Sequence, residues 1–508
     1  MKQVSKAIVL LFFTTFVNGQ TLQDVLRYST NNLSGTARYT AMGGAFGALG
    51  GDFGALENNP AAGSVFDNTQ FSITTSSNRT TNDASYFGSN YQNKHRDRDF
   101  DQVGFVLVLK NSKQNPKVDI DLPWSKLSFA FNYQKTANFN NSFIADGYNN
   151  RGVDQYFLNN AQGIALENLQ LLDGENDSEL YSYLGEDYGF NAQQAFLGFQ
   201  SYLIDATEDT FSNTSYISSV NGGSAGYFHE YETSRDGGIK KYTFNFSGEY
   251  LNKYNVGISI NRHKLEYRET SDFYESNYSD DSALNAFRFN NELFAFGEGI
   301  SFQLGGIAKL NKEIRVGISY ESPTWFSIIE ETTQFVVSDG DDQGNTTIEP
   351  NVITSYPEYS FKTPSKYTGS FAYVFGKKGL VSVEYTQVNY EKAKFNEPND
   401  AYLVDQNTQI TNNLNSAGIL RFGGEYRFGN YSIRAGYIKQ DASLKNFDNS
   451  ATSKSIGAGI NFGGSSLDLS VVSSEMMLQQ QLFSSGLTDN INLNRDQLGI
   501  RLSYILKL

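Results

Sequence analysis

Residues with recognised chemical roles are few in this sequence and widely separated. The chain has 508 residues, no cysteine and 3 histidines. Without cysteine there is no disulfide, no thiolate metal ligand and no cysteine nucleophile. Three dispersed histidines without HExxH spacing do not suit a zinc hydrolase. No grouping of serine, histidine and aspartate is visible, although a fold could bring distant residues together. The sequence therefore predicts neither an enzyme nor a bound cofactor.

One segment has the oxygen-rich composition of a calcium loop. It reads Asp339-Gly340-Asp341-Asp342-Gln343-Gly344, and carboxylates are preferred ligands of Ca²⁺. The segment lacks the closing bidentate glutamate of an EF-hand, and acidic loop tips are commonly only solvated. No metal site is predicted, and calcium binding at Asp339–Asp342 is left open.

Charge and composition exclude one class of partner and favour one kind of element. With 40 basic and 55 acidic side chains the formal net charge is −15, which argues against nucleic acid because phosphate binding needs Lys and Arg. Aromatic residues make up 14% of a chain that has 46 Gly and only 8 Pro, with a mean hydropathy of −0.44. Many Tyr and Phe in a polar chain suggest strands with one apolar and one polar face.

The first residues predict export. Lys2 and Lys6 precede an apolar stretch over 7–17, and Asn18-Gly19-Gln20 follows. A charged start, a short apolar stretch and a small residue before the cut are typical of a secretory signal peptide, here 1–19. The alternatives are a short buried helix or a membrane anchor, but the apolar stretch is too short to span about 30 Å of hydrocarbon. No other stretch reaches the length of a transmembrane helix.

From residue 68 onward, apolar residues recur at every second position, which is the period of a strand. The clearest run alternates Tyr242, Phe244, Phe246, Gly248 and Tyr250 with Lys241, Thr243, Asn245, Ser247 and Glu249. Similar runs occupy 367–375, 420–428 and 498–506, with charged residues on the opposite face. A soluble sandwich would also alternate, so the period alone does not identify the fold.

The lengths of the loops distinguish a soluble sandwich from an outer-membrane barrel. Short turns at 252–253, 310–312, 376–379, 429–430 and 463–465 alternate with longer polar stretches at 275–286, 337–356, 396–414, 442–450 and 480–490. Outer-membrane barrels have this pattern because one side carries tight turns and the other long loops. The expected strands are 69–80, 101–111, 125–140, 238–251, 254–274, 287–309, 313–336, 357–375, 379–395, 415–428, 430–441, 451–463, 465–479 and 491–507. The sequence therefore predicts an all-β protein, a transmembrane 14-stranded antiparallel β-barrel over 68–508.

The segment 20–67 precedes the first expected strand and is rich in small residues. It contains Gly43, Gly44 and Phe46 and ends in a turn with Asn59, Pro60 and Ala61. Glycine and alanine allow close backbone packing, so we expect a small helical plug, the N-terminal hatch, inside the barrel. The alternative is a periplasmic linker, although linkers rarely carry so much Ala, Leu and Phe.

A second segment, 141–237, is expected to be a long extracellular and partly helical loop. Apolar residues lie on one helical face in two stretches, and the second stretch contains Phe190, Phe196, Phe199, Tyr202 and Leu203. Such a stripe is usually buried against its neighbour. The functional interpretation is an apolar landing site at the barrel mouth, where a ligand would be admitted. Burial of the stripe and a landing site are compatible interpretations.

The order of these segments resembles the outer-membrane long-chain fatty acid and hydrophobic compound transporters of the FadL/TodX type. The resemblance rests on Ala41-Met42-Gly43-Gly44-Ala45-Phe46, Gly51-Asp52 and Asn58-Asn59-Pro60-Ala61 before a fourteen-strand barrel. It implies passive uptake of hydrophobic molecules such as long-chain fatty acids through a monomer in the cell outer membrane. It also implies contact with outer-membrane lipid, lipopolysaccharide and the barrel-assembly machinery.

Members of that family release ligand sideways through a gap at a kinked third strand. Here the third expected strand has no Gly or Pro between Ser125 and Ser142, so the sequence does not locate such a gap. Two other functions stay open. Barrels similar to this family serve as structural or shuttle components of the type IX secretion system, and an unselective porin is a third possibility that a hatch would oppose.

Overall fold

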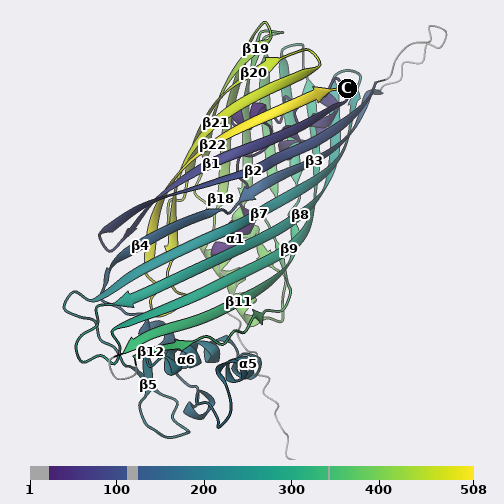
Figure 1. The fold of residues 1–508 in the computed structure, drawn as a ribbon. Coiled ribbons are helices and arrows are strands. Elements are labelled where there is room, and N and C mark those ends of the chain that lie inside the picture. Colours follow the sequence, from purple (N-terminus) through teal and green to yellow (C-terminus); the bar gives the residue numbers. More distant parts are fainter. Residues whose placement is uncertain (1–21, 111–123, 341–343) are drawn as a thin grey trace, which may run out of the picture.

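A closed barrel forms most of the structure (Figure 1). The computed structural model describes residues 22–110, 124–340 and 344–508. Its wall is built, in chain order, from β1 (Gln70–Tyr86), β2 (Ser89–Lys110), β3 (Trp124–Asn138) with β4 (Asn141–Asn149), β7 (Tyr227–Tyr250), β8 (Tyr254–Ser276), β9 (Ala286–Lys309), β10 (Ile314–Glu321) with β11 (Trp325–Gly340), β14 (Tyr359–Lys362) with β15 (Lys366–Val374), β16 (Gly379–Asn389) with β17 (Lys394–Phe395), β18 (Ser416–Phe428), β19 (Tyr431–Gln440), β20 (Ala451–Asn461), β21 (Ser465–Gln481) and β22 (Asn490–Lys507).

These segments make fourteen antiparallel wall strands within the described residues. The barrel closes because β1 also pairs with β22, from Gln70 opposite Lys507 to Ser85 opposite Asn492. Closure removes the unpaired sheet edge, which a spanning structure in hydrocarbon cannot leave open. The predicted fold class is confirmed.

The remaining elements lie inside the barrel or at one of its ends. They are α1 (Leu22–Ser29), α2 (Ala37–Ala41), α3 (Ala55–Asn58), η1 (Pro60–Val65), α4 (Asp154–Ala161), η2 (Leu166–Asn168), α5 (Asp177–Asp187), α6 (Phe190–Gln200), β5 (Ile204–Ala206), β6 (Tyr216–Ser218), β12 (Gly344–Ile348), β13 (Thr354–Ser355), η3 (Tyr390–Lys392) and α7 (Ala401–Asn413). None of the helices in the described residues is long and apolar enough to cross a membrane.

The wall strands alternate between an apolar outer face and a polar inner face. On β7, Phe244 is 53% exposed whereas its neighbour Asn245 is 1% exposed. On β8 the same contrast separates the exposed Ile260 from the buried Ser259. Because successive side chains of a strand point to opposite faces, each strand presents a lipid-facing row and an inward row.

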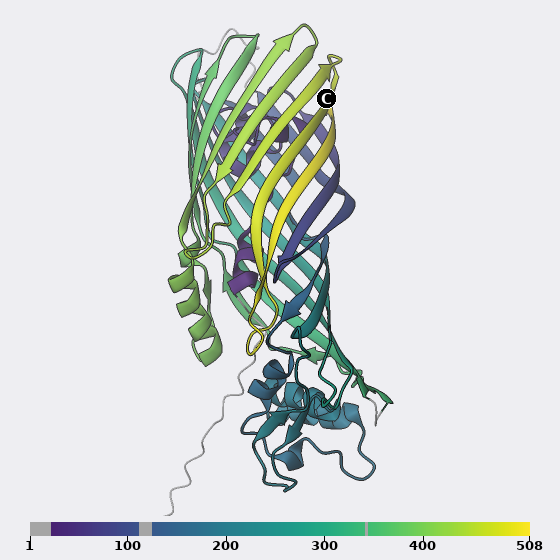
Figure 2. The same ribbon diagram turned by 90° about the vertical axis from the view of Figure 1, so that its left-hand side faces the viewer.

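The two ends of the barrel differ. One end holds Gln70, where the wall begins, and Lys507, where it ends. From β7 onward the strands that meet at this end are joined by tight turns, such as the three residues 251–253 between the paired Tyr250 and Tyr254, with φ angles of +51° at Leu251 and +54° at Asn252. At the other end lie α7 and a cap of α4, α5, α6, β5 and β6 (Figure 2). We call these the short-turn end and the long-loop end.

The expected boundaries were wrong at the first hairpin. The segment 81–100 was expected as a loop, but β1 and β2 extend through it and meet at a turn at Phe87-Gly88. Within this segment Arg96 and Arg98 lie on the outer face of the hairpin, whereas Asp97 and Asp99 bond on the other face. The first and last residues of the expected insertion, 141–149 and 227–237, are also strand.

Candidate functional site

The N-terminal segment lies inside the barrel, where α1 is visible through the wall strands in Figure 1. We call residues 22–67 the hatch. Phe46 and Leu56 are fully buried and Phe53 almost fully. They belong to a hydrophobic cluster that also includes Val106 and Ala372 of the wall. The hatch is therefore packed against the inner face of the barrel by apolar as well as polar contacts.

The predicted turn at Asn59-Pro60-Ala61 joins the hatch to the wall. The Asn59 side-chain amide donates to the carbonyl of Gly47 within the hatch (2.8 Å) and to the wall carbonyls of Gly306 (3.1 Å) and Ile318 (3.3 Å). Its Oδ1 accepts a hydrogen bond from the Ala61 amide (3.0 Å). One buried side chain thus connects two segments of the hatch with two neighbouring wall strands.

The other predicted hatch residues, Gly43, Gly44 and Phe46, lie in a second segment of the hatch. Gly43 and Gly44 have φ angles of +60° and +72°, which favour glycine. Gly43 lies against the backbone of β18 and β19. The Phe46 ring packs with Tyr39, with ring centroids 5.5 Å apart, and Arg38 lies 5.2 Å from the Phe46 centroid. These residues fix a tight reversal of the hatch next to the wall.

Wall glycines that face inward give the hatch its space, and sequence reasoning missed them. A Cβ at any of five of these positions would collide with the hatch; the pairs are Gly257 with Pro60, Gly305 with Asn59, Gly317 with Gly47, Gly436 with Gly43, and Gly457 with Ala41. A signal was present, because glycine inside a strand often marks a close approach of another backbone.

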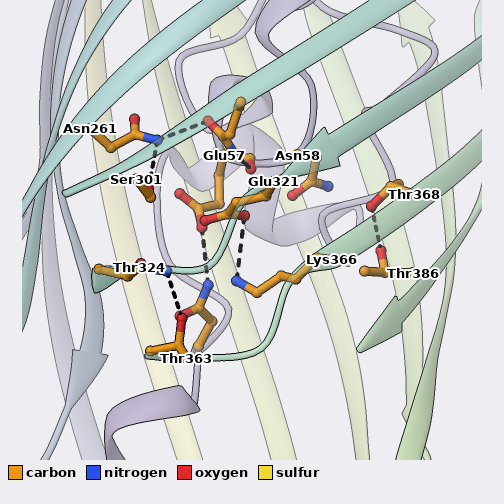
Figure 3. A network of polar contacts seen from close by, with 12 residues as sticks. Glu57, Asn58, Asn261, Ser301, Glu321, Thr324, Thr363, Lys366, Thr368 and Thr386 are labelled. Carbon is orange, nitrogen blue, oxygen red and sulfur yellow. Dashed lines mark hydrogen bonds and ion pairs between the residues drawn. The ribbon is translucent and has the colours of Figure 1, made fainter. Parts of the chain in front are cut away.

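One cluster of charges, the Glu57 cluster, joins the hatch to β7, β10 and β15 (Figure 3). Lys241 Nζ contacts Glu57 Oε2 at 2.9 Å and Glu321 Oε1 at 3.3 Å. Lys366 Nζ lies 3.5 Å from Glu321 Oε2, and Figure 3 shows Glu57, Glu321 and Lys366 converging on one point. Lys241 is almost fully buried, so this cation depends on its two carboxylates.

A second cluster, the Glu425 cluster, joins the hatch to β18, β19 and β21. Arg38 of the hatch donates from Nε to Glu425 Oε2 (2.8 Å), and Arg434 donates to the same oxygen (2.6 Å). Arg434 also bonds to Asp468 (2.6 Å). Within the hatch, burial raises the pKa of Asp52, although Arg38 lies 3.9 Å away. The hatch is therefore held by charge pairs to two separate groups of wall strands.

A cavity of about 1110 Å³ opens on the long-loop side of the hatch. Its floor includes α1 and its outer rim includes α7. Its lining is mixed, with many Asn, Gln and Ser side chains beside apolar groups such as Leu22, Leu26, Phe139, Leu293 and Ile419. The volume is that of a site for a small molecule rather than for a folded protein segment.

The wall has a break beside this cavity. Backbone pairing between β2 and β3 runs from Lys110 opposite Lys126 to Gln102 opposite Gln134 and stops there. Beyond this point, within the described residues, β2 pairs only with β1 and β4 pairs only with β7. Asp101 is the extra residue of a bulge in β2, and bulges bend a strand.

Side chains replace the missing backbone pairs across the wall break, which we define as 97–101 of β2 and 135–141 of the third wall strand. Asn138 donates to Asp97 (2.7 Å) and Lys135 contacts Asp99. Six residues of the wall break also line the cavity: Asp101, Lys135, Asn138, Phe139, Asn140 and Asn141. The cavity therefore reaches a part of the wall that is closed by side chains alone.

The wall break has a sequence signal on a different strand. Asn140 Oδ1 accepts a hydrogen bond from the Gly237 amide (3.0 Å), and Asn138 Oδ1 accepts one from the Asn140 amide (3.1 Å). Gly237 has a φ of +109°. The third strand is thus interrupted by asparagine side-chain bonds and by glycine on β7, which explains why a search for Gly or Pro in 125–142 could not find it.

The five residues suggested as a landing site lie in the cap. Phe196 and Leu203 are fully buried in the cap core, and Phe199 packs against that core. Phe190 is partly buried, and Tyr202 is 44% exposed with a φ of +60°. None of the five lines the lumenal cavity, so most of this set forms the core of the cap. A role in admitting ligand stays a prediction.

No metal site is found among the described residues, in which no His, Asp and Glu side chains group so as to hold an ion. The calcium loop considered above lies partly outside the described residues, because it includes 341–343.

Comparison with known proteins identifies the fold. No protein-family model matches the sequence, and no curated protein matches it either. Among solved structures, a Pseudomonas aeruginosa FadL homologue aligns with 94% of this chain and 99% of its own, at 9% identity and a TM-score of 0.55. The P. putida toluene transporter TodX aligns over the same shares at 14% identity and a TM-score of 0.50. The chain therefore has the fold of the FadL/TodX type, a fourteen-stranded barrel with short helices near its N-terminus.

Proposed function

We propose that the protein is an outer-membrane channel for passive uptake of hydrophobic molecules such as long-chain fatty acids. The fold supports this proposal, because one structure that shares it is described as a toluene transporter and another as a FadL homologue. In this proposal the long-loop end faces the medium and the short-turn end faces the periplasm, as in other outer-membrane barrels. No covalent chemistry and no energy source are involved.

The single observation that carries the proposal is the position of the cavity. It lies between the packed hatch and the long-loop end and reaches the wall break. In this proposal the hatch closes the direct path to the short-turn end. A molecule that enters the cavity from the medium would therefore leave sideways, past the side chains of 97–101 and 135–141, into the lipid layer.

A reversible crosslink across the wall break tests this path. Because the chain has no cysteine, Asp97→Cys with Asn138→Cys places thiols only at the break, where the native side chains are 2.7 Å apart. The double variant is treated with a short bis-methanethiosulfonate reagent in cells that depend on the channel. Uptake of radiolabelled oleate should fall on crosslinking and recover when the disulfides are reduced.

A matched pair controls for damage to the barrel. Asn261 and Ser301 are opposite each other on the fully paired β8 and β9, with a hydrogen bond of 3.2 Å between their side chains. Crosslinked Asn261→Cys with Ser301→Cys should leave uptake unchanged. If the crosslink at the break has no more effect than this control, ligand does not leave there. The structural or shuttle function in secretion would then be preferred to transport.

A further inference from the structure

Four cations lie together on the outer face of the first hairpin. Arg79 of β1 and Lys94, Arg96 and Arg98 of β2 are all exposed, and we call them the basic cluster. Arg79 is directly opposite Arg96 in the strand register, and Lys94 and Arg98 flank Arg96 on the same face. In a chain with a net charge of −15, such a concentration of positive charge requires an explanation.

The cations of the basic cluster form no ion pair among the described residues, whereas some outward cations of β8 and β9 do. On β8, Arg262 contacts Glu298 at 2.7 Å, and on β9, Arg288 contacts Asp272 at 3.0 Å. Like charges directly opposite each other destabilise a strand pair. The arrangement at Arg79 and Arg96 therefore favours an external anion.

Nearby carboxylates do not neutralise the cluster. Asp97 and Asp99 alternate with it on β2 but bond on the other side of the strand, to Asn138 and Lys135. Asp496, exposed on the adjacent β22, is opposite Thr81 and has no ion pair with the cluster. The cations remain available to a ligand from outside the barrel.

The cluster lies just beyond the apolar belt on the same strand. The exposed outer residues of β2 nearer the short-turn end are Phe100, Phe105, Leu107 and Leu109. Toward the hairpin tip the outer face changes at once to Arg98, Arg96 and Lys94. At about 3.3 Å per residue the three cations extend over about 13 Å along the strand. This is the boundary between hydrocarbon and headgroups on the long-loop side.

We propose that the basic cluster binds the phosphate groups of a phosphorylated glycolipid, the lipopolysaccharide of the outer leaflet. Arginine pairs with phosphate through two parallel hydrogen bonds, and three arginines with one lysine offer several such contacts. Ser77 and Thr81 lie opposite Arg98 and Lys94, and their hydroxyls suit the sugar. The acyl chains would lie on the apolar belt below. This inference depends on outer-membrane placement but not on which molecule is transported.

Native mass spectrometry of the full chain tests the proposal with deep-rough lipopolysaccharide as the probe. The wild type should bind it. The variant Arg79→Gln, Lys94→Gln, Arg96→Gln and Arg98→Gln should lose about tenfold or more in affinity, since several charge-assisted bonds disappear. The control Arg262→Gln with Lys264→Gln removes two exposed cations that both pair with Glu298 and should bind like the wild type. Heat-modifiable migration in gels shows which variants fold.

Two further binding measurements distinguish the phosphate groups of lipopolysaccharide from other anionic lipids. Binding should fall similarly for wild type with dephosphorylated lipopolysaccharide, and phosphatidylglycerol should bind much more weakly than the glycolipid. A variant with Arg79→Lys, Arg96→Lys and Arg98→Lys keeps the charge and should retain most binding. Equal binding by the glutamine variant, or equal binding of phosphatidylglycerol or of the dephosphorylated probe, would overturn the assignment. Oleate uptake by the glutamine variant should be unchanged, so failure here is distinct from failure of the transport proposal.

Discussion

At the scale of single residues, the clearest contrast is between two adjacent glycines on β9. A Cβ at Gly305 would collide with the Asn59 side chain, whereas a Cβ at Gly306 has its nearest neighbour, the Asn255 carbonyl oxygen, at 3.8 Å. Gly305→Ala should therefore cost about 1–3 kcal/mol of folding free energy, as overpacking does, and should loosen the hatch. Gly306→Ala should be nearly neutral. Urea unfolding in liposomes measures both, and equal effects would mean that the hatch does not seat against β9.

A second residue-scale prediction concerns the lipid face. Phe244 is 53% exposed on the outer face of β7. Phe244→Arg should cost about 2–4 kcal/mol if this position lies near the bilayer midplane. Ser234 is on the same strand and face but beyond the apolar belt, so Ser234→Arg should cost little. Unfolding from liposomes compares the two, and a similar penalty at both positions would contradict the assigned membrane level.

At the scale of elements, the hatch is the part whose removal is most informative. Deleting 21–62 should leave a folded, heat-modifiable barrel, because the wall closes through β1 and β22 without the hatch. Single-channel conductance should rise sharply, since roughly forty residues no longer fill the lumen. Oleate uptake should lose its saturation.

The milder change Asn59→Ala with Pro60→Ala removes the bonds from Asn59 to β9 and β10. It should raise conductance and weaken the saturation of uptake to a smaller extent than the deletion. If the deletion variant conducts no better than its parent, residues 22–67 do not block the channel.

Elements also show what the sequence could and could not predict. Alternating side chains and loop lengths were sufficient for the fourteen strands, because each strand must bury one row and expose the other. The extension of the first hairpin over 81–100 was missed because Lys94, Arg96 and Arg98 are charged on a face that lies above the apolar belt, where the usual pattern ends. The hatch was predicted from its small residues, but its partners on the wall were not, since Gly305 and Asn59 are 246 positions apart. Likewise, the wall break arises from bonds between Asn140 and Gly237, which no local pattern contains.

At the scale of the whole molecule, the orientation in the membrane can be tested on intact cells. A protease site inserted after Gly174, an exposed residue of the cap, should be cleaved by added protease. A site inserted after Asn252, in a tight turn at the short-turn end, should be protected until the outer membrane is opened. The reverse cleavage pattern would mean that the barrel has the opposite orientation, with the basic cluster at the inner leaflet.

Barrel closure also constrains the order in which the molecule can assemble. The seam between β1 and β22 joins Gln70 to Lys507, the most distant partners in the sheet, so forming it closes the longest loop of the chain and should come late. The hatch immediately precedes β1 and lies wholly within the ring that this seam completes. We expect it to occupy the lumen before the last strand docks, because afterwards it could enter only through an end of the barrel. Substitutions that crowd the hatch would then act first on the rate of closure, and cells would accumulate open, protease-sensitive intermediates before any mature channel showed a defect.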